Sequence, residues 1–278
     1  MRTIDHYVAV VPDQEAGRAA FARLGFHVRP TATHIEFGSS NAVVIFPHTY
    51  LELLYLAHAR DILKAQYDGC DLGLAHVSLW SDSLADERAR LQALGYTPGP
   101  EGNARRKVVL PDGSEGETDS SFLYNWASRN RFLSIFHSEH RRPAMNYIEG
   151  YTGHPNGAVD LARVAGASQQ PGDDLGYYRD SWAREPEQAD DTGFAFRGAR
   201  GEVMEVRTPA ALHARYGDLF DAVPGAAAGG IQVALHYRVK DRAATQAWLD
   251  ERGVVTVALA DGIAVAPQEA EGMILVFE

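Results

Sequence analysis

Two histidines and one glutamate stand where they could bind a metal ion together. His6 lies in the strand-like segment IDHYVAVVPD, and His76 has the matching place in the later segment LAHVSLWSD. Glu52 lies in the apolar segment YLELLYL, where a carboxylate is costly to bury unless it has a partner. Two imidazoles and a carboxylate suit a divalent transition metal, whether Fe, Mn, Co, Ni or Zn. The sequence therefore predicts one such metal, bound by His6, Glu52 and His76.

Further candidates for this site lie in two other segments. In RFLSIFHSEH, an alignment of LSI with LEL puts Ser134 at the place of Glu52, and a slip of three residues brings His137 there instead. Serine is a poor ligand and histidine a good one, and His137 is our predicted general acid or base. His34 and Asn41 flank the turn FGSS and are predicted to contact the substrate.

Such a site requires repeated elements, and the chain contains three clear copies of one pattern. Each copy is a strand-like segment, an aspartate, a helix-like stretch with an apolar stripe, and a glycine, followed by further strand-like segments. Aspartate favours the start of a helix and glycine its end. These pairs are Asp13 with Gly25, Asp82 with Gly95, and Asp241 with Gly253. A weaker fourth copy fits between the second and the last of them.

The repeats predict an α+β fold of four βαβββ units, which begin near residues 3, 72, 157 and 230. One unit cannot bury its sheet face alone, so we expect paired units to curl into two open barrels with the helices outside. The predicted domains are 1–140, which holds the metal cleft, and 157–278, which is a degenerate copy. A linker rich in Pro and Gly joins them over 141–156.

The second domain lacks the histidine pair. Arg163 and Glu205 stand near the places that His6 and Glu52 occupy in the first domain. We predict a structural salt bridge between them, and we assign the active cleft to the first two units.

Composition narrows the classes of partner and compartment. The chain has 278 residues and a net charge of −11, so it would repel a phosphate backbone unless its basic residues were clustered. The clusters Arg105-Arg106-Lys107 and Arg141-Arg142 are short and are expected to be solvated surface, which argues against nucleic acid. No apolar run is long enough to span a membrane. One cysteine and no export signal favour a cytoplasmic protein. We expect a small-molecule substrate and allow for a homodimer.

These motifs resemble a glyoxalase-like domain of the vicinal oxygen chelate superfamily, which includes glyoxalases, bleomycin-resistance proteins and extradiol dioxygenases. The resemblance rests on IDHYVAVVPD, FGSSN, YLELL, LAHVSLWSD and HPNG, and it covers residues 3 to about 140 well. It implies metal ligands at His6, Glu52 and His76, and a substrate that chelates the metal through two adjacent oxygens. The implied chemistry is that of an isomerase or lyase, with a metal-stabilised enolate or oxyanion.

The resemblance leaves two alternatives. Ring-cleaving dioxygenases also have four units, but they hold their metal in the last two, which lack ligands here. Antibiotic-binding members use the same cleft without a metal and without catalysis. Glyoxalase I-type members usually add a second glutamate in the second unit, where this chain has Ser134 or His137.

Overall fold

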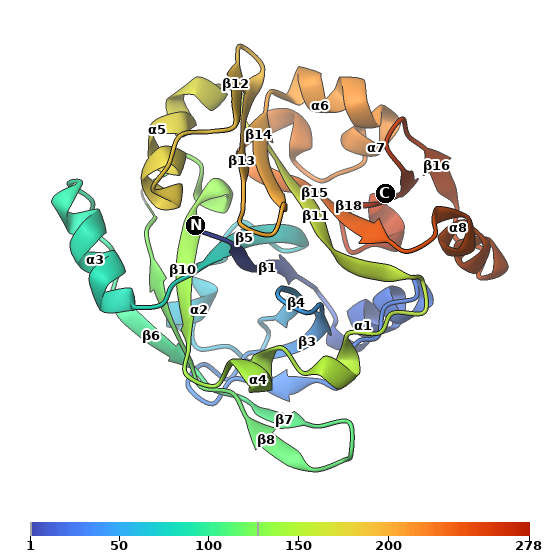
Figure 1. The fold of residues 1–278 in the computed structure, drawn as a ribbon, viewed down its shortest axis with the longest axis horizontal. Helices are drawn as coiled ribbons and strands as arrows, with labels where there is room; N and C mark the ends of the chain where they lie inside the picture. Colours follow the sequence, from blue (N-terminus) through green and yellow to red (C-terminus); the bar gives the residue numbers. More distant parts are fainter. Residues whose placement is uncertain (1, 127) are drawn as a thin grey trace.

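Four βαβββ units make up the computed structural model, which describes residues 2–126 and 128–278 (Figure 1). The first unit comprises β1 (Ile4–Val10), α1 (Gln14–Arg23), β2 (Ala32–Thr33), β3 (Ser40–Ile45) and β4 (Tyr50–Tyr55). The second comprises β5 (Gly73–Trp80), α3 (Leu84–Ala93), β6 (Glu101–Ala104), β9 (Ser120–Tyr124) and β10 (Ile135–His140). The third comprises β11 (Ala158–Ala167), α5 (Pro171–Trp182), β12 (Gln188–Asp190), β13 (Gly193–Arg197) and β14 (Val203–Arg207), and the fourth β15 (Ile231–Val239), α8 (Arg242–Glu251), β16 (Thr256–Ala258), β17 (Ile263–Val265) and β18 (Ile274–Phe277). Each first strand begins one residue after its predicted start, so the repeat prediction is confirmed.

Other short elements lie between and within the units. They are α2 (Asp61–Lys64), β7 (Lys107–Val109), β8 (Glu115–Glu117), α4 (Pro143–Asn146), α6 (Pro209–Tyr216), α7 (Asp218–Asp221), and the 3-10 turns η1 (Arg131–Leu133), η2 (Glu149–Tyr151), η3 (Ala226–Ala228) and η4 (Pro267–Glu269). β7 and β8 form a separate hairpin that projects from the second unit (Figure 1).

Local chemistry at the helix ends follows the repeat. The side chain of Asp13 accepts a hydrogen bond from the backbone N–H of Ala16 at 2.8 Å, and Asp241 caps α8 in the same way. In the second unit Ser83 caps α3 instead of its neighbour Asp82. α1, α3 and α8 each end at a glycine in the left-handed region, where a side chain would be strained, whereas α5 ends at Ala183 with a φ of 50°. The glycine φ angles are 86° at Gly25, 89° at Gly95 and 63° at Gly253.

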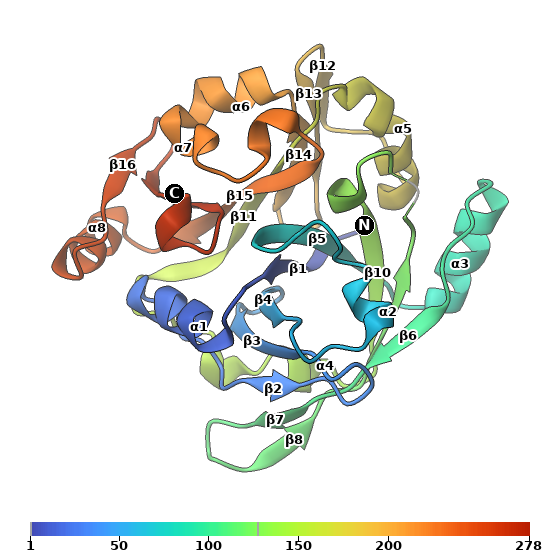
Figure 2. The ribbon, with the colours of Figure 1, turned by 180° about the vertical axis from the view of Figure 1, so that it is seen from behind.

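The units pair into two eight-stranded mixed sheets of identical design. The first has the order β2-β3-β4-β1-β5-β10-β9-β6, and the second β12-β13-β14-β11-β15-β18-β17-β16. In each, the first strands of two units run antiparallel at the centre, and the sheet curls around one face (Figures 1 and 2). The predicted α+β fold of paired βαβββ units is therefore confirmed.

The two sheets pack against each other through one face each and share one hydrophobic core. Tyr7 of β1 donates a hydrogen bond to the hydroxyl oxygen of Tyr237 of β15 at 3.1 Å, and Phe46 stacks on Tyr237. α1, α5 and α8 add Phe21, Trp182 and other side chains to the same core. The opposite, concave faces therefore point away from each other, and each could hold a cleft.

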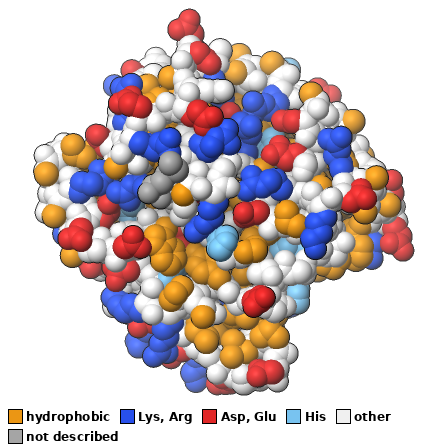
Figure 3. Space-filling model, in the orientation of Figure 1, with side chains coloured by type: hydrophobic (Ala, Val, Ile, Leu, Met, Phe, Trp, Pro, Cys, Tyr) orange, Lys and Arg blue, Asp and Glu red, His pale blue; other side chains and the backbone are white. Residues whose placement is uncertain are grey.

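The concave face of the second sheet is filled. α6 and α7 lie across it and pack Leu212 and Phe220 against the small side chains of β11 and β15. The predicted ion pair is present, with Arg163 Nη1 3.0 Å from Glu205 Oε2, and Arg215 of α6 contacts the other oxygen of Glu205. An open cleft remains on the first sheet. On the face in Figure 3, acidic and basic side chains are interspersed and hydrophobic ones gather in the lower half, near α4 and the β7–β8 hairpin.

Two equivalent glycines test the packing between the sheets. A Cβ at Gly25 would lie 2.5 Å from Trp248 Nε1 of α8, whereas a Cβ at Gly95 would meet nothing within 4 Å. Both have the same left-handed backbone, so Gly95→Ala should cost about 1–2 kcal/mol for strain alone. Gly25→Ala should cost clearly more. Chemical denaturation measures both, and equal losses would contradict the tight contact between α1 and α8.

Candidate active cleft

A cleft with a cavity volume of about 60 Å³ lies on the concave face of the first sheet. Polar and aromatic side chains share its wall. The polar members include His6, His34, Glu52, Arg106, Ser120 and His140, and the aromatic ones include Tyr50, Tyr67, Phe122, Tyr124 and Phe136. Apolar walls with a few convergent polar groups are typical of small-molecule sites.

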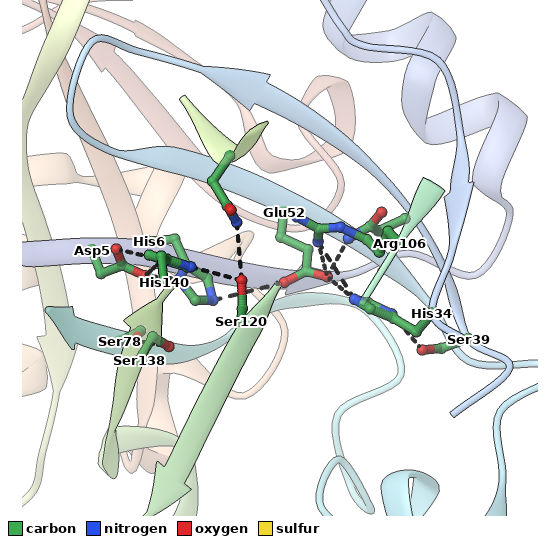
Figure 4. Close-up of polar contacts among 12 residues, drawn as sticks. Asp5, His6, His34, Ser39, Glu52, Ser78, Arg106, Ser120, Ser138 and His140 are labelled. Atoms are coloured by element: carbon green, nitrogen blue, oxygen red, sulfur yellow. Dashed lines mark hydrogen bonds and ion pairs between the residues drawn. The ribbon is translucent and has the colours of Figure 1, made fainter. Parts of the chain in front are cut away.

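Glu52 is the centre of the polar group. Its Oε1 accepts a hydrogen bond from Asn41 Nδ2 at 2.5 Å and lies 3.5 Å from His34 Nε2 and 3.7 Å from Arg106 Nη1 (Figure 4). Its Oε2 lies 3.8 Å from His6 Nε2. Burial alone would raise the pKa of Glu52, but His34, Arg106 and His6 outweigh it and hold the pKa below its usual value. The carboxylate is therefore charged at neutral pH.

Strand register brings these side chains together from both units. Glu52 of β4 lies beside Val8 of β1 and opposite Val43 of β3, so it shares the concave face with both. His34 forms a backbone bridge with Arg106, which precedes the β7–β8 hairpin. The alternation of an extended chain turns Arg106 inward, at 4% exposure, while its neighbours Arg105 and Lys107 are exposed. This corrects our expectation that the whole basic cluster is solvated.

A β-bulge at Asp5 builds a second polar group behind His6. The register between β1 and β5 shifts between Ile4 and His6, which turns Asp5 to the same side as His6. Asp5 then accepts hydrogen bonds from His6 Nδ1 at 2.5 Å and from His140 Nε2 at 3.0 Å (Figure 4). It accepts a third from the hydroxyl of Tyr147. Burial would raise the pKa of Asp5, but the contacts with His140 and His6 outweigh it and hold the pKa far below its usual value.

This network fixes the orientation of the His6 ring. With Nδ1–H donating to Asp5, the other ring nitrogen, Nε2, faces Glu52 and the cavity. His140 Nδ1 is bonded to Ser120 Oγ at 2.7 Å, and Asn146 donates to the same hydroxyl at 3.3 Å. Sequence reasoning missed Asp5, His140 and Ser120. The adjacency of Asp5 to His6 was visible, but the bulge that turns it inward was not.

Among the described residues, two groups bring three metal-ligating side chains within 4.8 Å of one another. One is Asp5, His6 and His140, and the other is His236, Asp261 and Glu278 near the C-terminal end of the chain. In the first group Asp5 already accepts hydrogen bonds from His6 Nδ1 and His140 Nε2. His6 Nε2 is the nitrogen left for a metal. Metal-bound histidines commonly donate their other N–H to a carboxylate, as His6 does to Asp5.

His76 is symmetry-related to His6, but its ring points elsewhere. Tyr7 pairs with Val77, flanked by the pairs His6–Ser78 and Val8–His76, so a local twofold axis relates the two histidines on one face. His76 Nε2 is 3.3 Å from the carbonyl oxygen of Gln66, and the ring packs among Tyr67, Trp126 and Phe132. The structure thus brings His6 and Glu52 together and leaves His76 behind aromatic side chains.

The structure does not bring Ser134 or His137 to the cavity. Ser78, two residues after His76, pairs with Phe136, just as Val8 pairs with Glu52, so Phe136 occupies the place equivalent to Glu52. The turn η1 before β10 shifts the register by two residues from the LSI alignment.

Strand alternation sends Phe136, Ser138 and His140 into the cleft and His137 to the other face. There His137 is fully buried, with Nε2 3.0 Å from Glu87 Oε1 of α3. It is therefore not placed to act on a ligand in the cavity.

His34 lines the cavity, whereas Asn41 lies behind it. Both surround Glu52. His34 Nδ1 bonds to Ser39 Oγ at 2.8 Å, and its Nε2 lies 3.4 Å from Arg106 Nη1. Asn41 is fully buried and positions Glu52 rather than lining the cavity. Burial lowers the pKa of His34 to about 4, despite the attraction of Glu52. At neutral pH His34 is thus a neutral proton acceptor.

Comparison with known proteins places the chain in context. A family model described as a glyoxalase-like domain matches residues 4–177. No curated protein matches significantly. A solved hypothetical protein from Staphylococcus aureus has 11% identity and a TM-score of 0.69, with 100% of this chain and 99% of that chain covered.

Two further solved structures match with a TM-score of 0.53. One is a fusion of a xylose isomerase-like TIM barrel with 4-hydroxyphenylpyruvate dioxygenase, at 13% identity, with 99% of this chain and 48% of that chain covered. The other is a mutant 4-hydroxymandelate synthase from Streptomyces coelicolor, at 15% identity, with 91% and 75% covered. These likenesses show the fold. In the described part of the chain, no helix is long and apolar enough to cross a membrane.

The depressed pKa of His34 predicts acid sensitivity. The unfolded chain binds this proton near pH 6.5, but the folded protein binds it only near pH 4. Stability from the neutral ring is therefore complete above pH 6.5 and is lost as the pH falls toward 4, with a slope of at most about 1.4 kcal/mol per pH unit. His34→Gln should flatten the curve of unfolding free energy against pH in this window. The exposed His58→Gln is the control, and identical curves for His34→Gln and wild type would contradict the burial of a neutral ring.

Proposed function

Because the chain belongs to the glyoxalase-like domain family of the vicinal oxygen chelate superfamily, we propose that it is a metal-dependent enzyme whose active site is the cleft of its first sheet. The proposed substrate is a small molecule with two adjacent oxygens, and the proposed reaction is isomerase- or lyase-like. The observation that carries the proposal is the pair formed by His6 Nε2 and Glu52 Oε2, 3.8 Å apart at the cavity wall.

The donor set of this pair fits a divalent transition metal. An imidazole nitrogen beside an ionised carboxylate is a suitable pair of ligands. Asp5 orients His6 from behind, at 2.5 Å from Nδ1. His76 remains the predicted third ligand, since its Nδ1 has no hydrogen-bond partner among the described residues and its ring shares the concave face. Once bound, the cation would act as a Lewis acid that polarises a substrate oxygen.

Arg106 and His34 supply the chain's own chemistry beside that pair. Arg106 lines the cavity and can donate to an anionic oxygen of the substrate. His34 Nδ1 donates to Ser39, so its Nε2 is the acceptor that now faces Arg106. A substrate oxygen that takes the Arg106 donor would leave His34 Nε2 free to accept a substrate proton. In this proposal His34 replaces His137 as the base.

A non-catalytic binding protein is the second candidate. Phe136 stands at the position equivalent to Glu52, and Phe122 and Tyr124 of β9 line the same cavity, so the second unit presents aromatic groups to the cleft. Such a wall favours retention of an apolar or aromatic ligand. The ring-cleaving dioxygenase alternative has no observation of its own in the first cleft, and oxygen uptake with catechols and Fe(II) tests it directly.

Metal content tests the proposed function. Protein loaded in turn with Fe, Mn, Co, Ni or Zn and then desalted should retain about one ion per chain with at least one of these metals. His6→Ala should lose it, because it removes a ligand, and a removed second-shell partner alone costs about 10–100-fold in affinity. His58→Ala, at an exposed site, is the control. Retention of none of the five metals by the wild type would refute the metal-dependent enzyme and favour the binding protein.

His76→Ala separates a ligand from a packing residue. If His76 binds the metal, the variant should lose metal while its apo form melts close to the wild type. If the ring only packs among Tyr67, Trp126 and Phe132, the variant should keep its metal, and its apo form should lose about 1–3 kcal/mol of stability. Metal analysis and apo-protein melting distinguish the two outcomes, and full metal content with a lower melting temperature would refute the ligand role.

A further inference from the structure

The side chain of Arg29 is a buried cation without a hydrogen-bond partner. Arg29 is 1% exposed, and its Nε, Nη1 and Nη2 atoms all lack a partner among the described residues. A buried charge is normally paired, because its removal from water costs free energy that only a counterion or hydrogen bonds can offset. A guanidinium with three unused nitrogens therefore indicates that something absent from the protein alone completes this site.

The backbone places Arg29 on the concave face, in the same row as Glu52. Val28 forms a bridge with Val44, and the N–H of Arg29 donates to the carbonyl oxygen of Val43 at 2.9 Å. Val43 lies directly opposite Glu52 in the neighbouring strand. Val43 packs with Tyr50 and Tyr151 on the concave side. Arg29 does not itself line the cavity; it lies behind the wall, within electrostatic reach of Tyr50, Glu52 and Arg106, which do line it.

The charges at this end of the cleft do not balance. Glu52 is a carboxylate whose charge acts on Arg29, and it already contacts Asn41, His34 and Arg106. No ion pair between Arg29 and Glu52 is present. Burial, together with repulsion from Arg106, lowers the pKa of Arg29 to about 9, so the Arg29 guanidinium is charged at neutral pH. Arg106 Nε also lacks a partner. Two buried guanidinium groups thus lie near one carboxylate, which contacts Arg106 but not Arg29.

We propose that Arg29 and Arg106 form an anion subsite, and that the ligand of this cleft carries a carboxylate or a phosphate beside its two adjacent oxygens. Planar guanidinium groups bind both anions through charge-assisted hydrogen bonds. The inference deepens the proposed function, because it names the substrate class of the same cleft. It concerns the charge of the ligand and not the metal, so the two can be tested apart.

Calorimetric titration tests the subsite in protein freed of metal and chelator, with pyruvate and inorganic phosphate as the probes. The wild type should bind at least one of them, and the tighter one identifies the class of anion. Arg29→Met keeps the length of the side chain and removes its charge, so it should weaken that binding about 10- to 100-fold, the range for a lost charged hydrogen bond. Arg106→Met should also weaken it. The exposed Arg142→Met is the matched control and should bind like the wild type.

The melting temperature of the ligand-free protein is a second measurement, and in it Arg29→Met should cause no loss, in contrast to its loss of anion binding. An unpaired buried cation costs stability in the empty protein, so Arg29→Met should melt at the same temperature as the wild type or higher. A structural Arg29 would give a lower melting temperature with unchanged anion binding, and that result would overturn the proposal.

Absence of binding of either probe by the wild type would overturn it as well, and so would wild-type affinity in Arg106→Met, even if Arg29→Met fails to fold. Loss of metal binding with retained anion binding would refute only the proposed metal chemistry.

Discussion

The architecture of the cleft depends on one buried carboxylate. Glu52 lies in an apolar strand, and burial would neutralise it if His34, Arg106 and His6 did not hold its charge. These partners come from a loop, a segment before a hairpin and a neighbouring strand, so they meet only when both units of the first sheet are folded. The requirement to satisfy one charge thus links the formation of the cleft to the assembly of the sheet.

The same sheet occurs twice, but one of the two concave faces is filled and the other holds a cavity. In the second sheet Arg163 and Arg215 neutralise Glu205 directly, and α6 and α7 fill the space above it. In the first sheet the corresponding residue is His6, whose Nε2 faces Glu52 across 3.8 Å. The exchange of an arginine for a histidine beside an equivalent glutamate therefore accompanies the difference between a closed core and an open cavity, while strand order is unchanged.

Periodicity in the sequence was sufficient to predict the four units, because Asp and Gly at helix ends and alternating strands are local signals. It also predicted that His34, Asn41 and Glu52 lie near His6. The remaining features depend on register. The turn η1 sets which side chains of β10 face inward and so places Phe136 and His140 in the cleft instead of His137. The bulge at Asp5 and the ring orientation of His76 arise from packing between units, which no single segment encodes.

The hairpin of β7 and β8 lies outside both large sheets, yet the residue before it, Arg106, reaches the centre of the cleft. Its backbone attachment to the first unit is the bridge with His34. No strand of either barrel needs the hairpin for its own pairing. Relatives could therefore lengthen, shorten or exchange this segment and alter ligand selectivity while the scaffold stays intact. Differences in ligand preference among such relatives should therefore map to the β7–β8 hairpin and the residue before it.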